Sequence, residues 1–201
     1  MRLSSPGART ILPTMIDVGI IIGSTRPGRK AEAVGKWVHE HAKQRSDASF
    51  ELVDLADYGL PLLDEPVPPS RGKYSKDHTK RWAAKIASLD AFVFVTPEYN
   101  YGTSAALKNA LDFIYAEWNN KAAGFVAYGG AGGARAVEHL RGYMAELQIA
   151  DVRTQVAFYL NSDFENYTTF KPSGPHHQKT LSAMLDQLVR WGTAMKTLRS
   201  A

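Results

Sequence analysis

The segment Gly23–Lys30 follows an apolar run, precedes a helical pattern, and is the first part of the chain that could bind a ligand. Its residues supply tight turns, hydroxyl groups and guanidinium groups, namely Gly23, Ser24, Thr25, Arg26, Gly28 and Arg29. Free backbone N–H groups at a helix N-terminus, together with such side chains, form a cradle for phosphate. An ordinary strand-to-helix turn with a capping Ser or Thr is the alternative. We predict a phosphate site.

The kind of phosphate follows from what this segment lacks. Gly23 and Gly28 have P-loop spacing, but Arg29 and Lys30 stand where Lys followed by Ser or Thr is required, so the magnesium-binding hydroxyl is missing. The later tip Thr96-Pro97 has no carboxylate that could serve as the second magnesium anchor. The dinucleotide pattern G-x-G-x-x-G fails because position 25 is Thr. The segment therefore predicts a mononucleotide phosphate.

A second unusual segment, Thr96–Ser104, combines aromatic rings with an amide and a proline. Its candidate binding residues are Pro97, Glu98, Tyr99, Asn100 and Tyr101. These types could form a wall for a flat heterocycle, and the Asn100 amide could donate to and accept from the edge of a ring.

A third segment, Tyr128–Gly133, is almost without side chains. Gly129 and Gly130 would let a planar ring lie close to the backbone, with N–H groups aimed at carbonyl oxygens on its rim. A flexible turn would explain the glycines equally well if they stood alone. Three such segments at one sheet edge make a stronger case than any one of them.

Regular elements must bring these segments together. Apolar runs predict strands at Ile16–Ile22, Phe50–Leu55, Ala91–Thr96, Ala122–Tyr128 and Val152–Leu160. Stripes of 3.6-residue period predict helices around 34–42, 107–114, 137–147 and 181–198. Almost wholly apolar strands are typical of a parallel sheet covered on both faces. We therefore predict an α/β fold, a three-layer doubly wound sheet of five parallel strands, which binds ligands at the carboxyl ends of its strands.

Composition narrows the class of protein. The 201 residues suit one domain, with 44% hydrophobic and 22% charged residues. No apolar run approaches the roughly 20 residues of a membrane span. The absence of cysteine excludes disulfides, thiolate nucleophiles and zinc–thiolate sites. A net charge of +4 with scattered basic residues favours a solvated surface over a nucleic-acid site.

The start of the chain bears on its location. Residues 1–14 lack the apolar centre of a secretory signal, so they are predicted to be a flexible lead-in before one domain at 15–201. Met15 directly before the first strand is an alternative start. The absence of a signal and of cysteine together predicts a cytoplasmic protein.

Four segments carry a resemblance to a known family. They are G-S-T-R-P-G-R (23–29), P-E-Y-N-Y-G (97–102), A-L-K-N-A-L-D (106–112) and Y-G-G-A-G-G (128–133). The chain resembles the NADPH-dependent FMN reductases, a flavodoxin-like family that includes quinone, azo-compound and chromate reductases. The resemblance covers about residues 15 to 160, and the P-E-Y-N segment is its most specific part.

The resemblance implies a cofactor and its partners. FMN would bind with its phosphate at Ser24, Arg26 and neighbouring amides, its ring beside 97–101, and its pyrimidine edge at Gly129 and Gly130. Thr25, Arg29 and Tyr128 complete the candidate cofactor-binding set. NADPH or NADH would donate hydride, and a homodimer or dimer of dimers is implied.

A ping-pong reduction of quinones, azo compounds, chromate or free flavin needs no side-chain acid or base, because the flavin carries the hydride. We therefore predict no catalytic side chain and a structural role for Glu98. The rival is a non-catalytic flavodoxin-type electron carrier or flavin-sensing regulatory protein. Such carriers need an acidic docking face, and this chain is net basic. The acceptor and the choice between NADPH and NADH stay open.

Other residue groups predict little chemistry. His39 and His41 point to different faces of a helix, and His176 and His177 are predicted in a loop without a carboxylate partner, so no metal site is expected. The string G-x-S-x-A at 102–106 lacks the second glycine of a hydrolase elbow.

Helices near 104–117 and 134–147 carry more large apolar residues than we expect one core to accept. They are Leu107, Leu111, Tyr115, Trp118, Tyr143 and Met144. From these we predict a two-fold contact beside the flavin.

Overall fold

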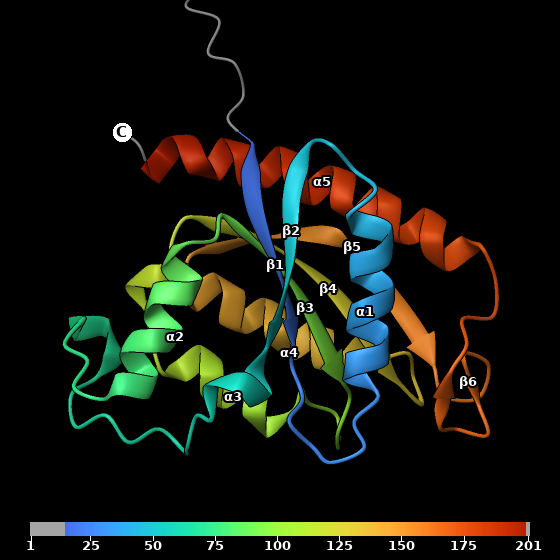
Figure 1. Ribbon diagram of the computed structural model, residues 1–201, viewed down its shortest axis with the longest axis horizontal. Helices are drawn as coiled ribbons and strands as arrows, with labels where there is room; N and C mark the ends of the chain where they lie inside the picture. Colours follow the sequence, from blue (N-terminus) through green and yellow to red (C-terminus); the bar gives the residue numbers. More distant parts are fainter. Residues whose placement is uncertain (1–14, 200–201) are drawn as a thin grey trace, which may run out of the picture.

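The computed structural model describes residues 15–199, and five parallel strands form its centre (Figure 1). The strands β1 (Ile16–Ile22), β2 (Ala48–Asp54), β3 (Ala91–Pro97), β4 (Lys121–Gly129) and β5 (Ile149–Tyr159) pair in the order β2-β1-β3-β4-β5. The main helices are α1 (Ala31–Ala42), α2 (Asp77–Ala87), α3 (Ala105–Asp112), α4 (Ala134–Glu146) and α5 (His176–Arg199). Short 3₁₀ turns lie at Leu55–Tyr58, Pro69–Arg71 and Ala116–Trp118. The predicted flavodoxin-like, doubly wound sheet is confirmed.

Alternating strand residues divide the core between the two faces of the sheet. In β3, Val93 and Val95 pack with α1 and α5, whereas Phe92 and Phe94 pack with α2, α3 and α4. Both faces of β3 are therefore apolar, which is why its sequence is a continuous apolar run. The helix layers on the two faces of the sheet hold the strands in place, and the loops at the carboxyl ends of the strands lie at the lower edge in Figure 1.

The predicted strand ends shift by a few residues. β2 begins at Ala48 because Ala48 and Ser49 pair with the first two residues of β1, and it ends at Asp54. β5 begins at Ile149, opposite Lys121, and its register shifts between Ala123 and Phe125. Pairing with the neighbouring strand decides these ends, and the apolar pattern of one strand does not show it.

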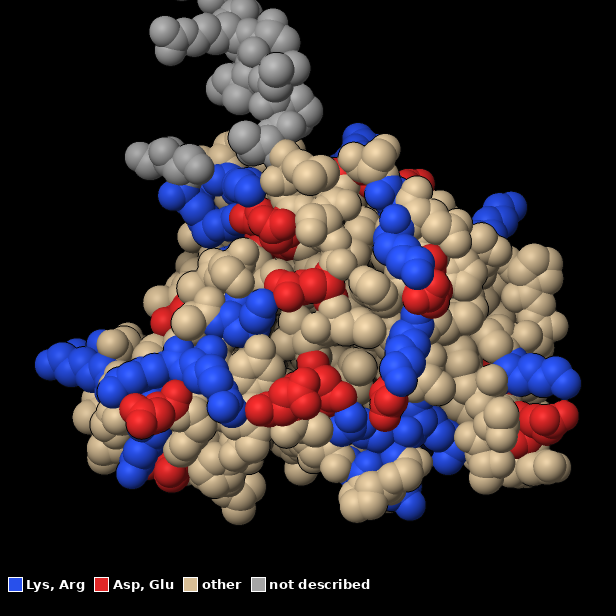
Figure 2. Space-filling model, in the orientation of Figure 1, with Lys and Arg blue, Asp and Glu red and all other residues tan. Residues whose placement is uncertain are grey.

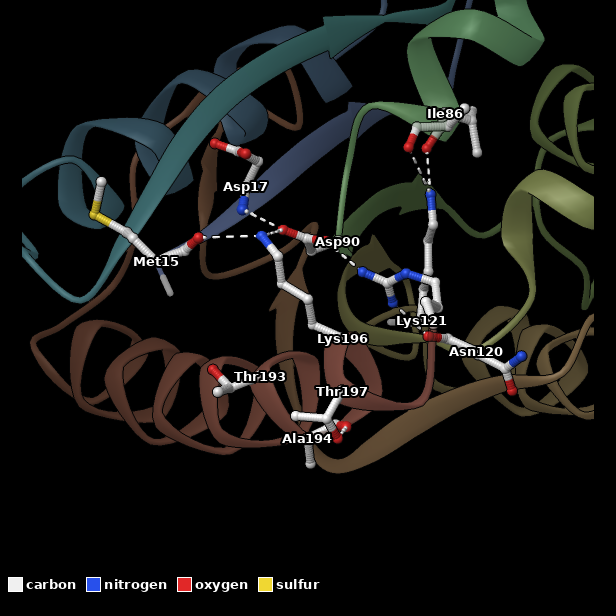
Figure 3. Close-up of polar contacts among 12 residues, drawn as sticks. Met15, Asp17, Ile86, Asp90, Asn120, Lys121, Thr193, Ala194, Lys196 and Thr197 are labelled. Atoms are coloured by element: carbon white, nitrogen blue, oxygen red, sulfur yellow. Dashed lines mark hydrogen bonds and ion pairs between the residues drawn. The ribbon is translucent and has the colours of Figure 1, made fainter. Parts of the chain in front are cut away.

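The opposite edge of the sheet is closed by charged groups. The Asp90 carboxylate accepts from the backbone N–H of Asp17 at 3.1 Å and from Lys196 Nζ at 2.7 Å (Figure 3), and it also pairs with Arg199. These contacts tie the end of α5 to the amino ends of β1 and β3.

Lys121 is buried at the same edge, where β4 begins. Its ammonium group donates to the carbonyl oxygens of Ile86, at 2.5 Å, and Ala87, at 3.4 Å, at the end of α2 (Figure 3). Burial lowers the pKa of Lys121 to about 8. The stability of the fold should therefore rise with pH above about 8, because the unfolded chain keeps this proton up to the ordinary lysine pKa of 10.5.

The chain between β5 and α5 corrects one prediction. It forms a small antiparallel hairpin, β6 (Phe164–Glu165) with β7 (Thr169–Phe170). His177 lies within α5, not in a loop, and its Nε2 lies 2.8 Å from the buried Asp163 carboxylate. The prediction that this histidine has no carboxylate partner was wrong, because the hairpin folds back to bring Asp163 to it.

The burial of α3 and α4 also differs from expectation. Four of the six residues expected at a dimer contact are buried in the core on the face of the sheet that α2, α3 and α4 cover. They are Leu107 and Leu111 of α3, Trp118 of the 3₁₀ turn after it, and Met144 of α4. Tyr115 and Tyr143, the other two residues expected at a dimer contact, are half-buried and pack against the same core. The argument for assembly from these residues therefore fails.

The predicted lead-in 1–14 lies outside the described residues. Among residues 15–199, no helix has both the length and the apolar character needed to cross a membrane.

Candidate active site

One crevice at the carboxyl edge of the sheet joins the three segments that the sequence singled out. Its lining comes from the loops after β1, β3 and β4 and from the end of β5. The lining residues are Arg26, Gly28, Arg29, Lys30, Pro97, Glu98, Tyr99, Tyr128, Gly129 and Leu160. Seven of them belong to the predicted set, and their role in cofactor binding stays a prediction.

The loop after β1 is a tight turn. Its start is fixed because the Gly23 backbone N–H donates to the Val95 carbonyl at 2.8 Å. Ser24 is buried, and its Oγ lies 3.5 Å from the Arg26 backbone N–H. Thr25 is exposed and lines a separate hollow on the α3 side of the loop. The turn thus presents Arg26 to the crevice and Thr25 away from it.

The charges of this loop are not equivalent. Arg29 pairs with Asp54 at the end of β2, and its Nη2 lies 3.9 Å from Glu32. Neither Arg26 nor Lys30 forms an ion pair among residues 15–199. Figure 2 shows basic side chains gathered at this lower edge of the molecule. Two cations are therefore available to an anion in the crevice.

Lys30 was missed by the sequence analysis as a binding residue. It occupies the N-cap position of α1 without a side-chain hydrogen bond to the helix. The position of Lys30 could have indicated its role. Lys30 follows Gly28 and stands at the start of the helix, where a basic side chain lies beside the backbone N–H groups that attract anions.

The segment after β3 forms a tight two-residue turn. The backbone groups of Tyr99 and Gly102 exchange hydrogen bonds of 2.9 and 3.0 Å. Asn100 and Tyr101, between them, have left-handed φ angles of 48° and 72°. Asparagine tolerates this conformation, but tyrosine adopts it rarely. Both side chains lie at the exposed tip, outside the crevice lining, whereas Tyr99 lines it.

Glu98 does not face the crevice as a free acid. Its side chain is 3% exposed, and its carboxylate pairs with Arg135 in the first turn of α4. It also accepts from the Arg135 backbone N–H at 3.1 Å. These contacts suit the structural role predicted for Glu98, with its charge neutralised.

The glycine segment turns tightly into α4. Gly133 has a φ of +74°, and a Cβ atom there would lie 2.4 Å from the Ala127 Cβ. At Gly130 an added Cβ would meet no atom within 4 Å. One glycine is thus needed by the fold, and the other leaves open backbone surface.

Tyr128 closes the back of the crevice. Burial raises the pKa of its hydroxyl well above the usual value, although a hydrogen bond from the Ala31 backbone N–H opposes the shift. The phenol is therefore a neutral wall between the glycine segment and the start of α1.

A more open groove lies elsewhere, between α2 and the end of β2. Its lining includes Arg81 and Lys85. Lys85 pairs with Glu51 at 3.0 Å, and Arg81 donates to the carbonyl groups of Asp57 and Tyr58. Its cations are already engaged, so the crevice remains the better candidate.

The strand order and the three loops that converge at the carboxyl edge of the sheet define a flavodoxin-like fold. Residues 16–162 match the family model for NADPH-dependent FMN reductases. The chain belongs to that family, as its motifs predicted.

The curated relatives agree. An NAD(P)H-dependent FMN reductase of Schizosaccharomyces pombe is 45% identical over 130 residues, 62% of this chain and 65% of the relative. One of a Nectria species is 36% identical over 158 residues, 74% of this chain and 79% of the relative.

A solved structure supports the fold. The flavoenzyme NAD(P)H:(acceptor) oxidoreductase FerB of Paracoccus denitrificans superposes with a TM-score of 0.69 at 20% identity. The match covers 90% of this chain and 99% of that one.

FMN is the cofactor of this family, and the residues present suit it. Arg26, Lys30 and the N-terminus of α1 would hold the phosphate. The open backbone at Gly130 and the wall formed by Pro97 and Tyr99 would accept a planar ring. The reductant of the family is NADPH or NADH.

Proposed function

We propose that this protein transfers two electrons from NADPH or NADH, through FMN, to quinones or related small acceptors. Azo compounds, chromate and free flavin are the other acceptors that fit the same chemistry. A 2-hydroxy-1,4-benzoquinone reductase of a Burkholderia species and a quinone reductase of Pseudomonas putida are among its relatives, which supports the quinone class.

One observation carries the proposal: a single crevice combines a wall of Pro97 and Tyr99 with two cations that have no carboxylate partner among residues 15–199. The open backbone of Gly130 directly follows Gly129 of its lining. When bound, FMN supplies the hydride chemistry. Arg26 and Lys30 would bind its phosphate, and Gly129 and Gly130 would present backbone N–H groups to the ring.

None of the lining residues is required as an acid or a base. Glu98 is engaged by Arg135, and the phenol of Tyr128 is held neutral by burial. The protein would bind and orient the reactants, and Pro97 and Tyr99 would keep water from the ring.

The proposal is tested with the purified protein. We expect a yellow protein whose absorbance near the flavin maximum is bleached anaerobically by NADPH, by NADH, or by both, and is restored by a benzoquinone. A flavin that dithionite reduces but neither nucleotide bleaches would favour the electron-carrier alternative. A protein that neither carries nor binds FMN would overturn the proposal.

A cytoplasmic homodimer or dimer of dimers is a further part of the proposal. It rests on the family resemblance, because four of the six residues first taken to support a contact are buried and the other two, Tyr115 and Tyr143, are half-buried against the core. Light scattering at micromolar concentration tests the assembly, and a monomer would contradict it.

A further inference from the structure

Arg135 joins two loops of the crevice although it does not line the crevice itself. It lies in the first turn of α4, after the glycine segment. Its Nε donates to Glu98 at 2.6 Å, and its guanidinium carbon lies 3.9 Å from the centre of the Tyr101 ring. One side chain thus holds the residue after Pro97 by charge and the tip of the turn by stacking.

The stack holds a turn that its sequence does not favour. Tyr101 has a φ of +72°, where a glycine is usual. The ring lies against the Arg135 guanidinium at the protein surface, and this contact offsets the unfavourable backbone conformation. Tyr99 lines the crevice at the other end of the same turn. Loosening Tyr101 should therefore displace Tyr99.

The ion pair controls a charge beside the crevice. The Glu98 side chain is 3% exposed, so solvent screens its carboxylate poorly. Arg135 is its cationic partner, so the pair adds no net charge. Fully reduced flavin is an anion, so an unpaired carboxylate there would weaken the binding of reduced FMN more than that of oxidised FMN.

We propose that Arg135 is a positioning residue of the flavin site that acts through two neighbours. Through Tyr101 it fixes the turn that carries Tyr99, which sets the affinity for FMN. Through Glu98 it removes a negative charge, which sets the midpoint potential of the bound flavin. The inference rests on FMN being the cofactor of this site.

The experiment uses Arg135→Met, Arg135→Lys, Tyr101→Leu and the double variant Glu98→Gln/Arg135→Met. The dissociation constant for FMN is measured by titrating the apoprotein, and the two-electron potential by equilibration with a reference dye. Arg141→Met is the matched control, because Arg141 also lies in α4, pairs with Asp151 and lies 5.1 Å from an aromatic ring, that of Phe125.

Arg135→Met should bind oxidised FMN about 10-fold more weakly and reduced FMN about 100-fold more weakly. The extra factor of about 10 corresponds to a potential about 30 mV lower. The double variant should regain the potential but not the affinity. Arg135→Lys and Tyr101→Leu should lose affinity and keep the potential, and Arg141→Met should change neither quantity.

The charge role would be overturned if Arg135→Met had the midpoint potential of the wild type. It would also be overturned if Glu98→Gln/Arg135→Met had a potential as low as that of Arg135→Met. Unchanged affinity in Tyr101→Leu and Arg135→Lys would overturn the positioning role. These two variants decide the positioning role even if Arg135→Met fails to fold. In that case Glu98→Gln/Arg135→Lys replaces the double variant in the test of the charge role. We expect its midpoint potential to be no lower than that of the wild type. Wild-type apoprotein that does not bind FMN would instead overturn the cofactor assignment.

Discussion

Substituting Gly130 by alanine separates the needs of the fold from those of the ligand. A Cβ at Gly130 would meet no protein atom within 4 Å, so Gly130→Ala should change the free energy of unfolding of the apoprotein by less than about 0.5 kcal/mol. A ring lying against this backbone must move to admit the methyl group. We expect FMN affinity to fall at least about 10-fold, or about 1.4 kcal/mol.

Two other glycines calibrate the experiment. Gly133→Ala should destabilise the apoprotein by about 3 kcal/mol or more, because its φ is +74° and its Cβ would lie 2.8 Å from the Tyr128 backbone nitrogen. Gly142, inside α4, also has open space around it, so Gly142→Ala should stabilise the helix by about 1 kcal/mol and leave FMN binding unchanged.

Urea denaturation of the apoproteins and fluorescence titration with FMN supply the two measurements. If Gly130→Ala binds FMN as tightly as the wild type, the glycine segment does not face the ring, and our placement of the ring is wrong. A large loss of apoprotein stability in Gly130→Ala would contradict the open space at this position.

Three further predictions concern single side chains. Arg26→Ala should weaken FMN binding about 10- to 100-fold in the same titration, since a charge-assisted hydrogen bond contributes about 1.5–3 kcal/mol. Unchanged affinity would show that Arg26 does not bind the phosphate. Burial lowers the pKa of Lys121 from 10.5 to about 8. Between these two pH values the unfolded chain holds a proton that the folded chain has lost, so the free energy of unfolding rises with pH. Urea denaturation should show a gain of about 2 kcal/mol from pH 7 to pH 9.5, and Lys121→Met should remove that gain. Asp163→Asn should lower the free energy of unfolding by about 1.5–3 kcal/mol, because an amide NH₂ group would face one of the donors that the two carboxylate oxygens now accept from, the Tyr159 and Ser173 backbone N–H groups. A loss below about 0.5 kcal/mol would show that Asp163 does not hold the hairpin.

The sequence predicted the strands well where burial alone decides them. β1 was placed at Ile16–Ile22, as the structure has it. The limits of β2 and β5 depend on the neighbouring strand, because Ala48 and Ile149 extend their strands through hydrogen bonds that periodicity does not reveal.

The same distinction explains the error over assembly. The apolar residues of α3 and α4 have a helical period, and the period shows that a face is buried without showing against what. Trp118, in the 3₁₀ turn after α3, is buried against Phe92 and Phe94, which come from the centre of the sheet. A core on each face of the sheet therefore had room for side chains that we had expected at an interface.

The sequence by itself determined that three unusual loops meet at one edge of a parallel sheet, because strands that alternate with helices run parallel and end at the same edge. It also determined the chemical types at that edge, from Arg26 to Gly130. Only the tertiary structure decided which charges are free to act. Arg29 is engaged by Asp54, Glu98 is neutralised by Arg135, and His177 finds Asp163, in each case through a contact between residues well separated along the chain. Coulomb attraction and hydrogen bonding act over a few ångströms, so folding had to bring these groups together before their roles could be assigned.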